Sequence, residues 1–219
     1  MDLPAQTTIT LWNIRIDEPV TVLTDLILGV VCMYAFLQIG KIESKHRLKW
    51  YLKYYFFTLG FGAIFGGLLG HAFLYTIPAS WKLISWVLVL ISVACMIHGF
   101  LELARPLLKP GIFRLFHLAS LFLLALAMFF TVWTLAFSPV KFYTITGLFG
   151  IVGSLSYYIY VRTGSRGVVR IMSAVGLAMV SAFVFSFEWG IGPWFNHNDI
   201  SHVILTASTL IVYRGAVMI

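Results

Sequence analysis

The sequence predicts an all-α membrane protein: a bundle of seven transmembrane helices that forms a single domain over residues 1–219. Hydrophobic residues make up 60% of the chain and charged residues only 11%, with a mean hydropathy of +0.94. A soluble domain of this length could not bury so much apolar surface, so lipid must solvate part of it. The apolar residues also fall into seven runs, each close to the roughly 20 residues that cross a bilayer core of about 30 Å.

The boundaries of the spans are set by charged residues and by clusters of proline and glycine. The segment before the first span carries Asp17 and Glu18 but only Arg15 as a basic residue. A cleavable signal peptide starts with a basic segment, so the first span is expected to remain in the mature protein. Arg214 stands near the end of the last span, whose fully apolar part is short. In order, the predicted spans are 21–39, 55–77, 83–104, 113–137, 141–161, 168–189 and 199–217.

Lysine and arginine are distributed unequally between the two sides of the predicted bundle. Twelve of them follow spans one, three, five and seven, whereas only Arg15, Lys82 and Lys141 lie on the other side. The positive-inside rule therefore places the N-terminus outside and the C-terminus in the cytosol. The net charge of +7 is explained by these cytosolic loops, and no nucleic-acid partner is expected.

Small and sulfur-containing residues give weaker indications. Gly62, Gly66 and Gly70 form a doubled small-xxx-small pattern that lets a neighbouring helix approach closely. The two cysteines, Cys32 and Cys95, lie inside apolar runs and form no disulfide framework. The sequence has no Asn-x-Ser/Thr sequon, which favours a bacterial inner membrane over a eukaryotic endomembrane without settling the choice.

Ionisable residues gather at one level of the predicted bundle, near its outer face. Such residues are costly within a membrane and usually face a cavity or a partner. The topology brings three of the six histidines and five of the eight acids to this level: His71, His197, His202, Asp17, Glu18, Asp25, Glu188 and Asp199.

The start of the last span carries the most informative part of this group. Asp199 and His202 are three residues apart and share a helix face, and His197 stands just before the helix. Two or three imidazoles with a carboxylate and an open position form the ligand set of a catalytic zinc ion. We therefore expect His71, His202, His197 and Asp199 as zinc ligands, with Asp199 or His197 also moving the proton of a zinc-activated water.

Less specific interpretations of the same residues stay open. A membrane histidine such as His71 is often a hydrogen-bonding residue between helices. Asp17, Glu18 and Asp25 could form a second site, for calcium, which prefers several carboxylate oxygens. Gly67, four residues before His71, leaves room either for a substrate or for a neighbouring helix.

The seven spans, the histidine late in span two and the histidine-containing start of span seven resemble the CREST superfamily of seven-helix membrane hydrolases, which includes the alkaline ceramidases and the progestin and adipoQ receptors. The resemblance implies a zinc-dependent amide hydrolase that acts on a lipid within the bilayer and binds calcium through an acidic N-terminal segment. His71 corresponds to the span-two ligand and His202 to the second histidine of the family's His-x-x-x-His. Asn198 stands in place of the first histidine, Gly67 in place of a serine, and Trp81 and Lys82 where the family has an aspartate.

The leading hypothesis is therefore a zinc-dependent hydrolase of a lipid or lipid-like amide or ester, with membrane lipid as its surroundings and a lipid-like molecule as its substrate. A non-enzymatic sensor or receptor that binds a lipid or small ligand in the same outer pocket is the alternative. A transporter is less favoured, because the span interiors offer few polar residues between the outer cluster and His98.

Overall fold

The structure is a computed structural model that describes residues 7–42 and 46–219. Within these residues it contains seven helices long and apolar enough to cross a membrane, which confirms the predicted number of spans and marks the chain as an integral membrane protein. The second span starts at Arg47 rather than at residue 55, because the Lys- and Tyr-rich stretch before the apolar run is already helical.

The seven spans are made of the following helices, some of which join end to end. They are α1 (Pro19–Gly40), α2 (Arg47–Phe65) with η1 (Gly66–Ala72), η2 (Ala79–Trp81) with α3 (Lys82–Ala104) and η3 (Arg105–Leu107), α4 (Pro110–Thr134), α5 (Ser138–Ile145) with η4 (Thr146–Gly153) and α6 (Ser154–Thr163), α7 (Arg166–Ser186), and α8 (His197–Val217).

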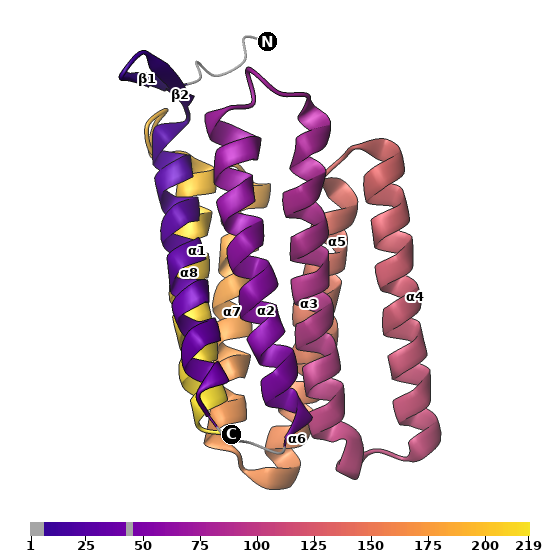
Figure 1. Cartoon of the computed structure of the whole chain (residues 1–219). Helices are drawn as coiled ribbons and strands as arrows, with labels where there is room; N and C mark the ends of the chain where they lie inside the picture. The colour runs from indigo at the N-terminus through magenta and orange to yellow at the C-terminus, as the bar shows by residue number, and fades with distance from the viewer. Residues whose placement is uncertain (1–6, 43–45) are drawn as a thin grey trace.

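The helices form a bundle in which the first and last spans are neighbours (Figure 1). Helix α1 packs against both α2 and α8, α2 packs against α3, and α7 packs against α8. Helix α4 lies at the edge of the bundle next to α3, with most of its side chains exposed. The contact between α1 and α8 brings the beginning and the end of the sequence together along their whole length, and the site described below depends on it.

A two-stranded hairpin precedes α1, an exception to the predicted all-α fold. Strands β1 (Thr8–Leu11) and β2 (Ile14–Asp17) pair in antiparallel fashion, and the turn residues Trp12 and Asn13 both have positive φ. Such a left-handed pair suits the twist of a two-residue hairpin. The hairpin stands at the end of the bundle opposite the C-terminus (Figure 1) and is used below to name that end the hairpin end.

Two of the seven spans contain a π-helical segment, η1 and η4. In η1 the Phe73 N–H donates to the Leu68 carbonyl five residues earlier, at 3.0 Å. This wider spacing turns the residues of η1 relative to a regular α-helix, and π-segments occur frequently at functional sites. His71 lies in η1, so the α-helical geometry assumed for it from the sequence does not hold.

The glycines of span two serve close packing, as the small-xxx-small pattern predicted. A Cβ atom added at Gly66 would lie 3.1 Å from the Ser85 hydroxyl of α3, and one at Gly62 would lie 3.4 Å from Leu88. Gly67 faces α1 instead: a Cβ atom there would lie 3.0 Å from the Asp25 Cβ. Of the two expectations for Gly67, the structure therefore shows the neighbouring helix and not an open space.

Candidate functional site

A cavity of about 400 Å³ runs from the hairpin end toward the middle of the bundle. Its deeper part is mainly apolar, with Leu59, Val89 and Leu205 in its wall. Ionisable side chains stand nearer the hairpin end: His71, His202, Asp25, Lys82 and Lys141 all line the same space. Six of the seven spans therefore supply either an apolar wall residue or an ionisable group, and a few polar groups at one end of an apolar pocket are typical of a small-ligand site.

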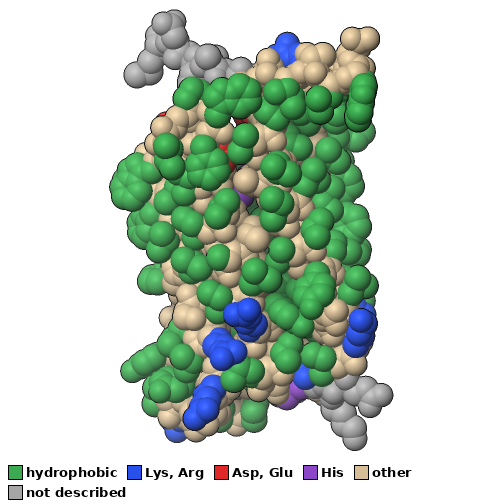
Figure 2. Space-filling view, turned by 90° about the vertical axis from the view of Figure 1, so that its left-hand side faces the viewer, with side chains coloured by type: hydrophobic (Ala, Val, Ile, Leu, Met, Phe, Trp, Pro, Cys, Tyr) green, Lys and Arg blue, Asp and Glu red, His purple; other side chains and the backbone are tan. Residues whose placement is uncertain are grey.

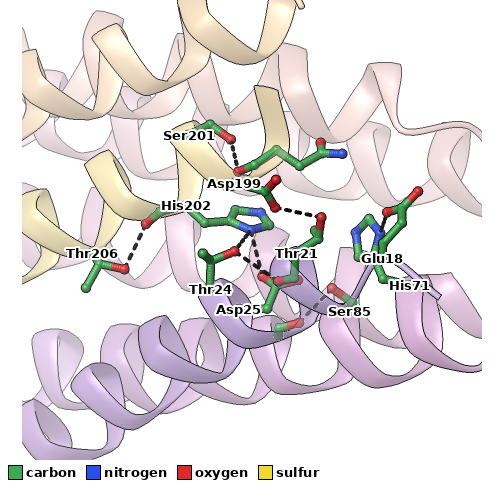
Figure 3. Close-up of polar contacts among 12 residues, drawn as sticks. Glu18, Thr21, Thr24, Asp25, His71, Ser85, Asp199, Ser201, His202 and Thr206 are labelled. Carbon is green, nitrogen blue, oxygen red and sulfur yellow. Dashed lines mark hydrogen bonds and ion pairs between the residues drawn. The ribbon is translucent and has the colours of Figure 1, made fainter. Parts of the chain in front are cut away.

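His202, in the second turn of α8, is oriented by two residues of α1. Its Nδ1 lies 3.3 Å from the Thr24 hydroxyl oxygen and 3.4 Å from an Asp25 carboxylate oxygen, as Figure 3 shows. The Thr24 hydroxyl donates its hydrogen to the Thr21 carbonyl at 3.0 Å, so its oxygen accepts from His202. With acceptors on both sides, Nδ1 carries the ring proton, and Nε2 holds the free lone pair.

His71 is oriented in the same way by a different carboxylate. Its Nδ1 is paired with the Glu18 side chain, which stands between the hairpin and α1 (Figure 3). Glu18 has a positive φ of 45°, and Pro19 follows it as the first residue of α1. This left-handed turn directs the chain from the hairpin into the helix, and it leaves Nε2 of His71 for a ligand.

Asp25, a residue of α1, is held against η1 and α8. It is 5% exposed, pairs with His202, and lies against Gly67, whose missing side chain allows the two helices to approach. A buried carboxylate is costly unless it is hydrogen-bonded. The contact of Asp25 with the His202 imidazole, 3.4 Å from Nδ1, offsets part of this cost and helps to fix the ring.

Asp199 takes no part in the cavity, although it is only three residues before His202. One of its carboxylate oxygens accepts from the Thr21 hydroxyl at 2.7 Å and the other from the Asn196 backbone N–H at 2.6 Å. Asn196 in turn accepts from the Asn198 backbone N–H, which completes a capping box at the start of α8. Asp199 is fully buried, and its bonds fix the start of α8 to α1.

His197 likewise does not line the cavity. Its ring packs edge-on against Phe185 of α7, with 5.7 Å between the ring centroids. Of the four residues expected to bind zinc, the structure therefore brings His71 and His202 to one cavity and places His197 and Asp199 elsewhere. Within residues 7–42 and 46–219, no three His, Cys, Asp or Glu side chains form a group that could hold a metal ion.

The three acids of the expected calcium site each pair with a residue of their own. Asp17 accepts from Arg15 at 2.6 and 3.2 Å, and this hydrogen bond raises the pKa of the Arg15 guanidinium, which lies outside the spans. Glu18 pairs with His71 and Asp25 with His202. Glu188, the remaining acid of this level, stands at a positive φ of 54° after α7.

The structure adds residues that the sequence pattern did not select. Thr24 orients His202, and Ser85, which lines the cavity from α3, donates to the Gly62 carbonyl at 2.7 Å. Lys82 and Lys141 had counted only as the minority of basic residues on their side. Thr24 is one helical turn after Thr21 and next to Asp25, and its role is seen only once the contact of α1 with α8 is known.

Comparisons with known proteins give a family and nothing more specific. No curated protein and no solved structure matches the chain. A family model covers residues 20–219, which include every span and every residue of the cavity wall. The chain belongs to DUF6962, a family of unknown function.

Proposed function

We propose that the chain is an intramembrane hydrolase of a lipid or lipid-like amide or ester, with the reacting carbonyl held near His71 and His202. One observation carries the proposal: two imidazoles line the same largely apolar cavity, and each has its Nδ1 paired with a carboxylate. A carboxylate at Nδ1 fixes the tautomer and orientation of a histidine that works through Nε2.

His202 is the better placed general base. Its Nε2 lone pair would take a proton from a water molecule as that water attacks the substrate carbonyl, and Asp25 would stabilise the imidazolium that forms. His71, once protonated and paired with Glu18, would donate a proton to the leaving nitrogen or oxygen. The apolar wall around Leu59, Val89 and Leu205 would hold the acyl chain.

Binding of zinc and of calcium remains a prediction, with fewer of the expected ligands brought together than the sequence suggested. A catalytic zinc ion takes three protein ligands and a water, but the expected set of His71, His202, His197 and Asp199 does not fit, since Asp199 is hydrogen-bonded to Thr21 and Asn196 and His197 packs on Phe185. The proton transfers described above need only the two imidazoles and their carboxylates. Measurement of bound zinc in the purified protein is therefore part of the functional test.

The hairpin end is proposed to face the outside of the cell, with the C-terminus in the cytosol and a bacterial inner membrane as the favoured location. Figure 2 supports this orientation: lysine and arginine side chains gather at the end opposite the hairpin, and most of the surface between the two ends is hydrophobic. Acidic atoms are visible only in the half nearer the hairpin, and histidine atoms are visible both in a gap in this half and at the opposite end. On this orientation the site lies beneath the outer leaflet.

The test uses purified protein in a neutral detergent and a fluorogenic lauroyl ester or amide. His202→Gln is expected to lower the rate of hydrolysis by at least about 100-fold, the usual contribution of a general base. His117→Gln changes a histidine of α4 that lies outside the cavity wall and should leave the rate unchanged. One zinc ion per chain that is lost in both His71→Gln and His202→Gln would confirm the zinc prediction, whereas an active, metal-free protein would assign the reaction to the imidazole–carboxylate pairs alone.

A rate that is the same in wild type and His202→Gln would contradict the proposal. Saturable binding of lauroyl compounds by a wild-type protein with no turnover would replace it with the sensor or receptor, which uses the same cavity without chemistry. Equilibrium dialysis with a radiolabelled lauroyl compound separates these two outcomes.

A further inference from the structure

Two lysines stand at the hairpin end of the cavity, and the proposed proton transfers use neither. Lys82 is the first residue of α3 and Lys141 lies in the first turn of α5. Both line the cavity and are partly buried. The Lys82 stem passes Gly70, where an added Cβ would lie 4.0 Å from its Cγ, so this glycine leaves room for the lysine beside the cavity.

Neither lysine has an acidic partner within the part of the chain that the structure describes. The acids nearest the cavity are already engaged, Asp25 by His202 and Glu18 by His71. Lys141 lies instead over the Phe185 ring, whose centroid is 6.0 Å from Nζ. A partly buried ammonium group is usually paired, so two of them without an ion-pair partner of their own concentrate positive charge at one end of the cavity.

The positions of the lysines on their helices increase this charge. A helix N-terminus carries a partial positive charge, so cations are disfavoured in the first turn and anions are favoured there. Lys141 stands in the first turn of α5, and Lys82 stands directly after the first turn of the helix that η2 and α3 form, at ends that meet the cavity. Both the ammonium groups and the helix ends would therefore be stabilised by a bound anion.

We propose that the ligand of this cavity is a single-chain amphiphile with an anionic head group, a carboxylate or a phosphate, which Lys82 and Lys141 bind. The acyl chain lies along the apolar wall at Leu205, and the ester or amide that joins chain and head lies beside His202 between them. This inference names the substrate class of the proposed hydrolase. Binding of the amphiphile does not depend on hydrolysis, because the residues that recognise the charged head and the apolar chain differ from those that move protons.

The experiment compares matched anionic and neutral ligands by equilibrium dialysis in neutral detergent. N-lauroylglycine is paired with N-lauroylglycinamide, and lauroyl lysophosphatidic acid with monolauroylglycerol. Wild type is expected to bind at least one anionic member about tenfold more tightly than its neutral partner. The arm with the larger ratio identifies the head group as carboxylate or phosphate.

The double variant Lys82→Gln/Lys141→Gln should lose this ratio and still bind the neutral ligands as wild type does, which also shows that it is folded. Lys109→Gln, at the opposite end of the bundle, should keep the ratio. Equal affinity of wild type for anionic and neutral ligands in both pairs, or a ratio that persists in the double variant, would overturn the inference. His202→Gln keeps the ratio on this account even though its hydrolysis is lost, so failure of the lysine site and failure of the proposed reaction are distinguishable.

Discussion

Histidines that are close in the sequence differ in their surroundings, and those surroundings decide what each can do. His197 and His202 belong to the same helix, yet one packs on an aromatic ring and the other lines the cavity with its Nδ1 bonded to α1. The sequence pattern predicted His202 and His71 as site residues because both lie near one end of an apolar span. It also selected His197 and Asp199, because proximity along the chain cannot distinguish a side chain that faces a cavity from one that caps a helix.

The capping role of Asp199 predicts a loss of stability without a matching loss of chemistry. In Asp199→Asn the amide can accept from either Thr21 or the Asn196 N–H but not from both, which leaves one buried donor without a partner. The free energy of unfolding should fall by about 1–2 kcal/mol, the cost of a lost cap or an unpaired buried group. Thermal unfolding in detergent measures this change, and the rate of hydrolysis by the folded variant should stay within about threefold of wild type. A hundredfold loss of rate at unchanged stability would instead make Asp199 catalytic.

Asp25 is a positioning residue, so its replacement should affect turnover more than binding. Asp25→Asn keeps the size of the side chain but removes the charge that stabilises the His202 imidazolium. We expect kcat to fall by about 100-fold, at the lower end of what a positioned acid–base group contributes. KM should change little, because the acyl chain binds to other residues. A rise in KM at constant kcat would contradict this role.

At the scale of the element, η1 and the hairpin show where the sequence pattern stops being informative. The apolar run that ends near His71 predicts a helix, but a π-helical and an α-helical segment have the same composition, so the direction of His71 could not be predicted. The hairpin was missed because its strands have four residues each and precede the first apolar run. Glu18 directly follows the hairpin and His71 belongs to η1, and the pair they form joins residues 53 positions apart.

Close packing of α1 on η1 predicts that even a methyl group at Gly67 is harmful. The added Cβ in Gly67→Ala would lie 3.0 Å from the Asp25 Cβ and 3.4 Å from the Val22 carbonyl oxygen, so α1 must shift. Overpacking of this kind costs about 1–3 kcal/mol, and the shift should also lower the rate of hydrolysis through Asp25. Gly176→Ala in α7 is the matched control, since nothing lies within 4 Å of its added Cβ, and it should be neutral or stabilising. Equal stabilities of the two variants in thermal unfolding would be evidence against the packing argument.

For the whole molecule, the apolar runs predicted the seven spans because the thickness of the bilayer fixes the length of a spanning helix. Alternation of span direction then placed His71 and His202 near the same end before any contact was known. The pairing of α1 with α8 was not predictable in this way, since seven helices of similar hydropathy can be arranged in many orders. Thr21, Thr24 and Asp25 acquire their roles only through that pairing.

The proposed orientation predicts which loops are reached from outside the cell. Thr10→Cys in the hairpin should react with a membrane-impermeant maleimide in intact cells, and Thr163→Cys at the end of α6 should react only after the cells are opened. Both positions are exposed, and wild type sets the background because Cys32 is buried and Cys95 is partly buried. The reverse labelling pattern would place the hairpin end in the cytosol.

The central claim is that a lipid-like substrate binds in the cavity with its reacting group beside His71 and His202. A cryo-electron microscopy map of the protein bound to a non-hydrolysable sulfonamide analogue of N-lauroylglycine tests it most directly. The account predicts density for the sulfonamide next to the His202 ring, with the alkyl chain along Leu205. Analogue density away from both imidazoles, or a map in which either ring is turned out toward the lipid, would contradict it.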